Sequence, residues 1–158
     1  MNRTGAFDRV ALGATDVLVS RLAWGMWRFQ GDDLARARTL VDAALDTGIN
    51  LFDTADIYGF DGRDGFGDAE ILLGRLFAAD PGLRRKLVLA SKGGVVPGVP
   101  YDSSADYLVA ACEASLHRLG TDHLDLFQVH RPDVLTHPAE LARALETLVT
   151  SGKVRAVG

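Results

Sequence analysis

The chain has 158 residues and carries 17 Lys and Arg against 21 Asp and Glu, which leaves a formal net charge of −4. This charge is too small and of the wrong sign for a protein that binds nucleic acid through its phosphates. Hydrophobic residues make up 47% of the chain and charged residues 24%, the balance of a globular domain. A single cysteine rules out an intrachain disulfide, and no apolar run approaches the roughly 20 residues that a membrane-spanning helix needs. We expect a cytoplasmic protein without a nucleic-acid or membrane partner.

The first half of the chain begins with two short apolar runs on either side of a turn, which predict a small β-hairpin. Two strand-length apolar runs follow, and after each comes a segment with apolar residues at helical spacing. The expected elements in chain order are a hairpin of Val10–Leu12 and Val17–Val19, a strand at Leu22–Phe29, a helix that begins near Asp32 or Asp33 and stops at Gly48, a strand at Asn50–Ala55 and a helix from Asp68 to about Ala79.

The second half repeats the alternation of strand and helix. Its strands read as continuous apolar runs, which is typical of strands buried on both faces, and its helices have recognisable caps. The expected elements in chain order are a strand at Leu87–Lys92, a helix capped by Ser103 or Ser104 that ends at Gly120, a strand at Leu124–His130, a helix with Pro138 in its first turn that stops at Gly152, and a strand at Val154–Gly158.

This repeated βα unit predicts a parallel sheet covered by helices, in either an open sheet or a closed (β/α)8 barrel. An open dinucleotide-binding sheet carries G-x-G-x-x-G after its first strand, and the sequence here, GMWRFQGDD, lacks it. This absence favours the closed (β/α)8 TIM barrel over the open sheet. A full barrel takes about 250 residues, so residues 1–158 would form the N-terminal portion of one incomplete barrel domain, with five of the eight strands.

Titratable residues interrupt these strands at one end only. Asp53, Lys92 and His130 lie near the carboxyl ends of three strands, and Tyr58 follows in the loop after Asp53. The carboxyl ends of parallel strands share one rim, so these four side chains are expected to converge. By contrast, Cys112, His117, His123 and His137 are interpreted as structural, Arg131 and Asp133 as a surface ion pair, and the glycines of Gly59–Gly67 as a source of loop flexibility.

The four rim residues have a coherent chemistry. A lysine at the end of an apolar strand needs an anionic partner, and Asp53 is on the adjacent strand. The ammonium favours the phenolate form of Tyr58, which makes its hydroxyl a better proton donor. His130 can donate a hydrogen bond to the same carbonyl oxygen. Protonating a carbonyl in this way leaves the hydride to a cofactor, because no side chain can deliver it.

The stretches FDTADIYG, LASKGG, SLHRLGTDHLDLFQVHRPD and SGKVRAVG resemble the aldo-keto reductases, in particular the bacterial oxidoreductase branch related to potassium-channel β-subunits. The resemblance implies a (β/α)8 barrel that interconverts a carbonyl compound and an alcohol with a nicotinamide cofactor. It implies Tyr58 as the proton donor, Asp53 and Lys92 as the residues that tune it, and His130 as the residue that positions the carbonyl.

With this resemblance, NADP(H) is favoured over NAD(H), and no metal is expected. The predicted cofactor contacts are Gly25, Met26 and Asp53, and the predicted substrate contacts are Trp27, Tyr58 and His130. Trp27 is as readily explained as a packing residue of the barrel. The substrate is a small carbonyl compound or alcohol.

Two features depart from the family pattern. Family members have a glutamate close after the tyrosine, whereas Glu70 follows Tyr58 by 12 residues. The chain also stops where the family continues into further strands, which would leave an unpaired apolar edge at Val154–Gly158. A missing C-terminal half or a partner chain is expected to cover that edge. Two other functions stay open: a nicotinamide-binding regulatory subunit, or an inactive half-barrel.

Overall fold

The computed structural model describes residues 8–99 and 101–158. Five parallel strands form one sheet, and their spatial order follows the chain order. The strands are β3 (Ala23–Gly25), β4 (Leu51–Asp53), β5 (Val88–Gly93), β6 (Leu124–Val129) and β7 (Val154–Val157). This sheet confirms the predicted parallel α/β architecture and all five expected strands, although β3 is much shorter than predicted. β3 ends early because the chain turns at once, with the Phe29 N–H donating to the Met26 carbonyl at 2.9 Å.

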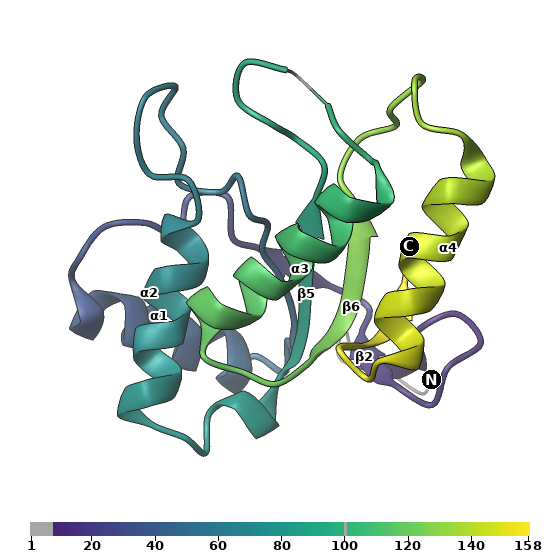
Figure 1. Ribbon diagram of the computed structural model, residues 1–158. Coiled ribbons are helices and arrows are strands. Elements are labelled where there is room, and N and C mark those ends of the chain that lie inside the picture. Colours follow the sequence, from purple (N-terminus) through teal and green to yellow (C-terminus); the bar gives the residue numbers. More distant parts are fainter. Residues whose placement is uncertain (1–7, 100) are drawn as a thin grey trace.

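Four α-helices cover one face of the sheet, and each packs against the next (Figure 1). They begin at or within two residues of the expected positions, and a side chain caps the beginning of α1, α3 and α4. The Asp33 carboxylate accepts from the Arg36 N–H at 2.9 Å, and His137 Nδ1 accepts from the Ala139 N–H at 3.1 Å. The helices are α1 (Leu34–Asp46), α2 (Asp68–Ala79), α3 (Ala105–Leu119) and α4 (Pro138–Thr150), with a short 3-10 helix, η1 (Arg84–Lys86), before β5.

The predicted hairpin forms from β1 (Arg9–Ala11) and β2 (Leu18–Ser20). Its residues Val17 and Val19 pack against Val88, at the beginning of β5, so the hairpin covers the amino ends of the strands. Asn50 ties it to the sheet: its side-chain carbonyl accepts from the Ser20 N–H at 2.7 Å, and its NH₂ group donates to the Leu18 carbonyl at 2.9 Å. Figure 1 shows β2 at the end of the molecule opposite to the loops that follow β4 and β5.

The main core lies between the sheet and the helices. Trp24 contributes edge-to-face contacts, with ring centroids 5.4 Å from Phe29 and 5.2 Å from Phe52. Cys112 is fully buried in this core, as predicted, and burial raises the pKa of its thiol to about 12. This cysteine is therefore an unreactive packing residue of the core.

Two expectations about the surface have different outcomes. The prediction of an ion pair between Arg131 and Asp133 is wrong. The Asp133 carboxylate instead accepts hydrogen bonds from the Ser103 N–H and the Thr136 hydroxyl. The expected position of the last strand is confirmed: β7 lies at one edge of the sheet, with β6 as its neighbour. Within the described residues, no helix has both the length and the apolar character needed to cross a bilayer.

Helices α2 and α3 approach each other closely at Gly74. A Cβ atom there would lie 3.1 Å from the Cα atom of Leu119 and would also collide with the carbonyl oxygen of Arg118. Both obstacles are backbone atoms, so neither can move aside by changing a rotamer. Glycine in the middle of a helix normally costs stability relative to alanine, and here the close approach of α3 explains its presence.

We therefore predict that Gly74→Ala destabilises the chain by about 1–3 kcal/mol, the usual cost of overpacking. The direction of the change in the free energy of unfolding separates the two effects, because helix propensity alone predicts that alanine stabilises the chain by about 1 kcal/mol. Urea unfolding monitored by circular dichroism measures the difference. Ala78→Gly, on the same helix, is the matched control for propensity, and a Gly74→Ala chain more stable than wild type would contradict the contact.

Candidate active site

The strand register places the predicted rim residues together. Asp53 ends β4 opposite Ala90, and Lys92 is two residues further along β5, on the same face as Ala90. His130 directly follows β6, where its backbone N–H donates to the Gly93 carbonyl at 2.9 Å. Tyr58 lies in a turn of residues 56–59 that follows β4. The four side chains come from three neighbouring strand ends, as the sequence predicted.

The Lys92 ammonium is the centre of this group. Its Nζ atom lies 2.8 Å from Asp53 Oδ2, 2.8 Å from the Thr54 carbonyl oxygen and 3.1 Å from Tyr58 Oη. These three acceptors use all three donors of the ammonium, and the side chain is only 12% exposed. The lysine is thus neutralised by one carboxylate and directed at one phenol.

The Tyr58 ring is fixed between two polar groups. The Lys92 ammonium also lies 4.6 Å from the ring centroid, and the His130 ring meets Tyr58 edge to face with centroids 5.6 Å apart. Both rings open onto a cleft of about 310 Å³. The cleft is lined by Trp27, Ile57, Tyr58, Phe60, Val95, His130 and Arg131. The site therefore offers an aromatic wall with hydrogen-bond donors at its base.

His130 is neutral over the physiological range. Burial and the charges of Lys92 and Arg131 lower the pKa of its imidazole to about 4, against a smaller opposing effect of Asp53. Its Nδ1 atom is buried without a hydrogen-bond partner among the described residues. A neutral ring has one N–H, and with the proton on Nε2 the imidazole can donate from that atom.

The predicted cofactor contacts Gly25 and Met26 and the predicted substrate contact Trp27 have different surroundings. Gly25 ends β3 opposite Asp53, is exposed, and has open space where a side chain would project. Met26 is fully buried in the core, and its N–H donates to the Asp53 carbonyl at 2.9 Å. Trp27 is 68% exposed and lines the cleft. Gly25 and Trp27 thus face the rim, whereas Met26 supports it from below, and all three assignments stay predictions.

The sequence analysis missed a buried polar cluster behind the rim. Glu70 on α2 is fully buried, accepts from the Ser91 hydroxyl at 2.5 Å and pairs with Arg118 Nε on α3 at 2.7 Å. Ser91 faces away from Lys92, as its place in the strand predicted. Asp56, two residues before Tyr58 in the same turn, is also buried. The spacing of Glu70 from Tyr58 was noticed in the sequence, but nothing there linked it to an arginine 48 residues away.

The glycine-rich loop after Tyr58 has a defined shape. Gly59 and Gly65 have φ angles of 102° and 84°, which disfavour any side chain. A Cβ atom on Gly59 would lie 2.9 Å from the Gly65 carbonyl oxygen. The Asp61 carboxylate accepts from the Arg63 and Asp64 N–H groups at 2.8 and 2.9 Å. Positive φ angles and close backbone approach account for Gly59 and Gly65, and the flexibility of the loop stays a prediction.

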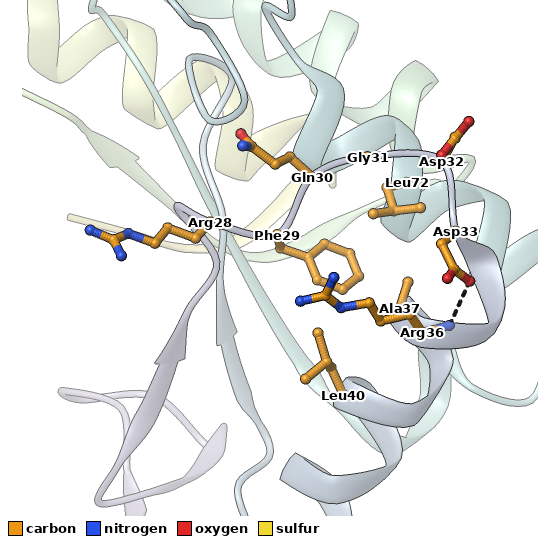
Figure 2. Close-up of a pocket in the computed structure, with 10 residues that line it drawn as sticks. All are labelled: Arg28, Phe29, Gln30, Gly31, Asp32, Asp33, Arg36, Ala37, Leu40 and Leu72. Atoms are coloured by element: carbon orange, nitrogen blue, oxygen red, sulfur yellow. Dashed lines mark hydrogen bonds between the residues drawn. The ribbon is translucent and has the colours of Figure 1, made fainter.

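A second cleft, of about 370 Å³, lies where the loop after β3 meets α1 (Figure 2). None of Asp53, Tyr58, Lys92 and His130 lines it. The Asp33 carboxylate there is occupied as the cap of α1, and Figure 2 shows the Arg28 side chain directed away from Phe29 and Leu72. Because the reactive groups converge on the cleft lined by Tyr58 and His130, that cleft is the candidate active site, and the one beside α1 is not.

Comparisons with known proteins agree with this geometry. A family model described as the aldo/keto reductase family matches residues 21–158. The chain is 59% identical, over 93% of its length, to a 6-dehydroglucose reductase of Novosphingobium aromaticivorans, and 41% identical, over 96%, to a 6-dehydroglucose reductase of Agrobacterium fabrum. It covers 49% and 52% of these proteins, so it spans about half the length of the curated relatives it matches.

A solved structure supports the same fold. The aldo-keto reductase AKR11C1 from Bacillus halodurans, in its holo form, matches with a TM-score of 0.81 at 31% identity. The match covers 96% of this chain and 50% of that structure. The sheet and helices described above thus have the arrangement found in about half of an aldo-keto reductase.

The lowered pKa of His130 yields a prediction for its titration. Nuclear magnetic resonance of the imidazole is expected to show a neutral ring until the pH falls to about 4, because protonation there places a charge in a buried site beside Lys92. The exposed His117 is the internal control. Protonation of His130 near pH 6.5, the ordinary histidine value, would contradict the described environment.

Proposed function

Because the chain belongs to the aldo/keto reductase family, we propose that it carries the proton-transfer site of an NAD(P)(H)-dependent oxidoreductase that interconverts a carbonyl compound and an alcohol. The observation that carries this proposal is the placement of the Lys92 ammonium between Asp53 and Tyr58 at the rim. The chain spans about half of its relatives, so the proposal concerns the protein in which these residues form one side of the active site.

In this proposal Tyr58 donates a proton to the carbonyl oxygen of the substrate. The Lys92 ammonium, 3.1 Å from Tyr58 Oη, stabilises the phenolate that the donation leaves behind. The Asp53 carboxylate holds the ammonium in place and compensates for its burial. The reverse reaction, oxidation of an alcohol, uses the phenolate as the base.

His130 is proposed to orient the carbonyl. Its ring is neutral and lies edge to face against Tyr58, so an Nε2–H donor acts beside the phenol without adding a positive charge. Two donors at one oxygen stabilise the negative charge that develops there during reduction.

A nicotinamide cofactor fits the open side of the site. The space beside Gly25 allows a flat ring to approach the backbone at the end of β3, and the exposed Trp27 borders the same region. Reduced nicotinamide supplies the hydride that completes the reduction. We propose NADP(H) as the preferred form.

The substrate is proposed to be a sugar-derived aldehyde. Two relatives bear the name 6-dehydroglucose reductase, and the cleft here combines the exposed Trp27 and the half-buried Phe60 with the exposed Arg131. Aromatic faces suit the apolar side of a sugar ring, and a guanidinium donates to its hydroxyls.

We predict that Tyr58→Phe lowers kcat and kcat/KM by about 100- to 10,000-fold, because it removes the proton donor and leaves the ring. Steady-state reduction of 6-dehydroglucose, with NADPH and NADH compared, measures the loss in the protein that carries this chain. Tyr101→Phe, at an exposed tyrosine outside the cleft, is the matched control. Activity within a few-fold of wild type would contradict the role of Tyr58. Cofactor binding without turnover in the wild type would favour a regulatory subunit.

Lys92→Met tests the role of the ammonium. The substitution keeps the length of the side chain and removes the charge 3.1 Å from Tyr58 Oη that stabilises the phenolate, so kcat is expected to fall by about 100-fold. Lys86→Met, at an exposed lysine on η1, controls for the general loss of a positive charge. A kcat of Lys92→Met equal to that of the wild type would contradict the electrostatic role.

A further inference from the structure

Asp56 is a buried carboxyl group that the proposed reaction does not use. The residue is 1% exposed, and neither carboxyl oxygen has a hydrogen-bond partner among the described residues. The group lies on the helix side of the sheet, where Oδ2 is 3.5 Å from the position that a Cβ atom on Gly93 would take. A charged carboxylate in this position would lack the donors that such a group requires.

The groups packed around Asp56 also disfavour its ionisation. Glu70 on α2 is a second buried carboxylate, and its charge acts on Asp56. Arg118 on α3 opposes this effect, but it is already paired with Glu70 at 2.7 Å. The Ile57 N–H and the Lys92 ammonium favour the charged form more weakly. Tyr107 on α3 faces Asp56 as well, and burial together with the Asp56 charge raises the pKa of its phenol to about 12.

The backbone of Asp56 connects it to Tyr58. The Asp56 N–H donates to the Lys92 carbonyl at 3.1 Å, which fixes the beginning of the turn of residues 56–59 to the end of β5. Within the turn, the Tyr58 N–H donates to the Ala55 carbonyl at 3.1 Å. A displacement of Asp56 toward solvent therefore moves the segment that sets the distance from Tyr58 Oη to Lys92 Nζ.

We propose that Asp56 is a positioning residue: its neutral carboxyl group allows the turn of residues 56–59 to stay on the end of β5, and its ionisation moves Tyr58 away from Lys92. The inference rests on the proposed function in that Tyr58 is the proton donor whose position matters. Asp56 itself does not touch the substrate.

The direction of the pH effect follows from the burial of Asp56. Burial, and then the charge of Glu70, raise the pKa of its carboxyl group from 3.8 to about 7. The folded chain therefore keeps a proton that the unfolded chain loses at lower pH. The stability associated with this proton is complete below pH 3.8 and is lost as the pH rises to about 7.

The test compares the pH dependence of unfolding in wild type and Asp56→Asn, which imitates the neutral carboxyl group. Between about pH 5 and pH 8, the unfolding constant of the wild type is expected to rise by 10- to 100-fold relative to that of Asp56→Asn, since only the wild type ionises. Asp46→Asn, at an exposed carboxylate on α1, should follow the wild type. Parallel curves for wild type and Asp56→Asn would overturn the proposal.

A second measurement addresses the position of Tyr58 and needs no turnover. In the wild-type chain, the carboxyl carbon of Asp56 and the Cζ carbon of Tyr58, observed by nuclear magnetic resonance, are expected to change together near pH 7. The Tyr58 change should be absent in Asp56→Asn. A carboxyl group that titrates near its ordinary value, or a Tyr58 signal that ignores it, would overturn the proposal even if the variant failed to fold.

The pH–rate profile separates this inference from the proposed function. The wild type should lose kcat above about pH 7 by a step that Asp56→Asn lacks, with little change in KM, because the geometry of the proton donor changes rather than the cleft. An inactive wild type would contradict the proposed function alone, and the unfolding and resonance measurements would still decide the role of Asp56. An identical alkaline limb in both proteins would count against it.

Discussion

The burial of the Lys92 ammonium is the constraint on which the arrangement of the rim depends. A charge that is 12% exposed needs close acceptors, and all three of its acceptors belong to β4 or to the residues just after it. The parallel register of β4 and β5 brings Asp53 and the Thr54 carbonyl to the ammonium, and the following turn brings Tyr58. The pairing of β4 with β5 therefore also brings Lys92 together with its three acceptors.

The parts of this structure that could be predicted from the sequence are those governed by local periodicity. Apolar runs alternating with helical stripes identified all five parallel strands and the four α-helices, and Asp33 and Pro138 marked helix starts. The rim was predictable for the same reason, because Asp53 and Lys92 interrupt apolar strands at their carboxyl ends. The length of the first strand was overestimated, because apolar residues continue to Phe29, whereas β3 ends at Gly25 and the Phe29 N–H already donates back to Met26 within a turn.

The parts that escaped prediction depend on contacts between distant segments. Nothing local to Asp56 or Glu70 indicates that they are buried, and only the approach of α3 shows that Glu70 pairs with Arg118. Gly74 carries no local signal either, because the backbone that excludes a side chain there belongs to another helix. Arg131 and Asp133 were paired by their proximity in sequence, but the peptide N–H of Ser103, 30 residues away, binds the aspartate. In each of these cases the surroundings of the residue are set by packing between segments that are distant in the sequence.

The hairpin at the amino ends of the strands bears on the order of assembly. Two of its attachments reach far along the chain: Val17 and Val19 pack against Val88 on β5, and Asp16 meets Arg155 across 139 residues. Closing loops of this size costs more chain entropy than the strand–helix–strand contacts between neighbours. The hairpin is therefore expected to dock late in folding, onto a sheet whose reactive rim has already formed, and to detach early in unfolding.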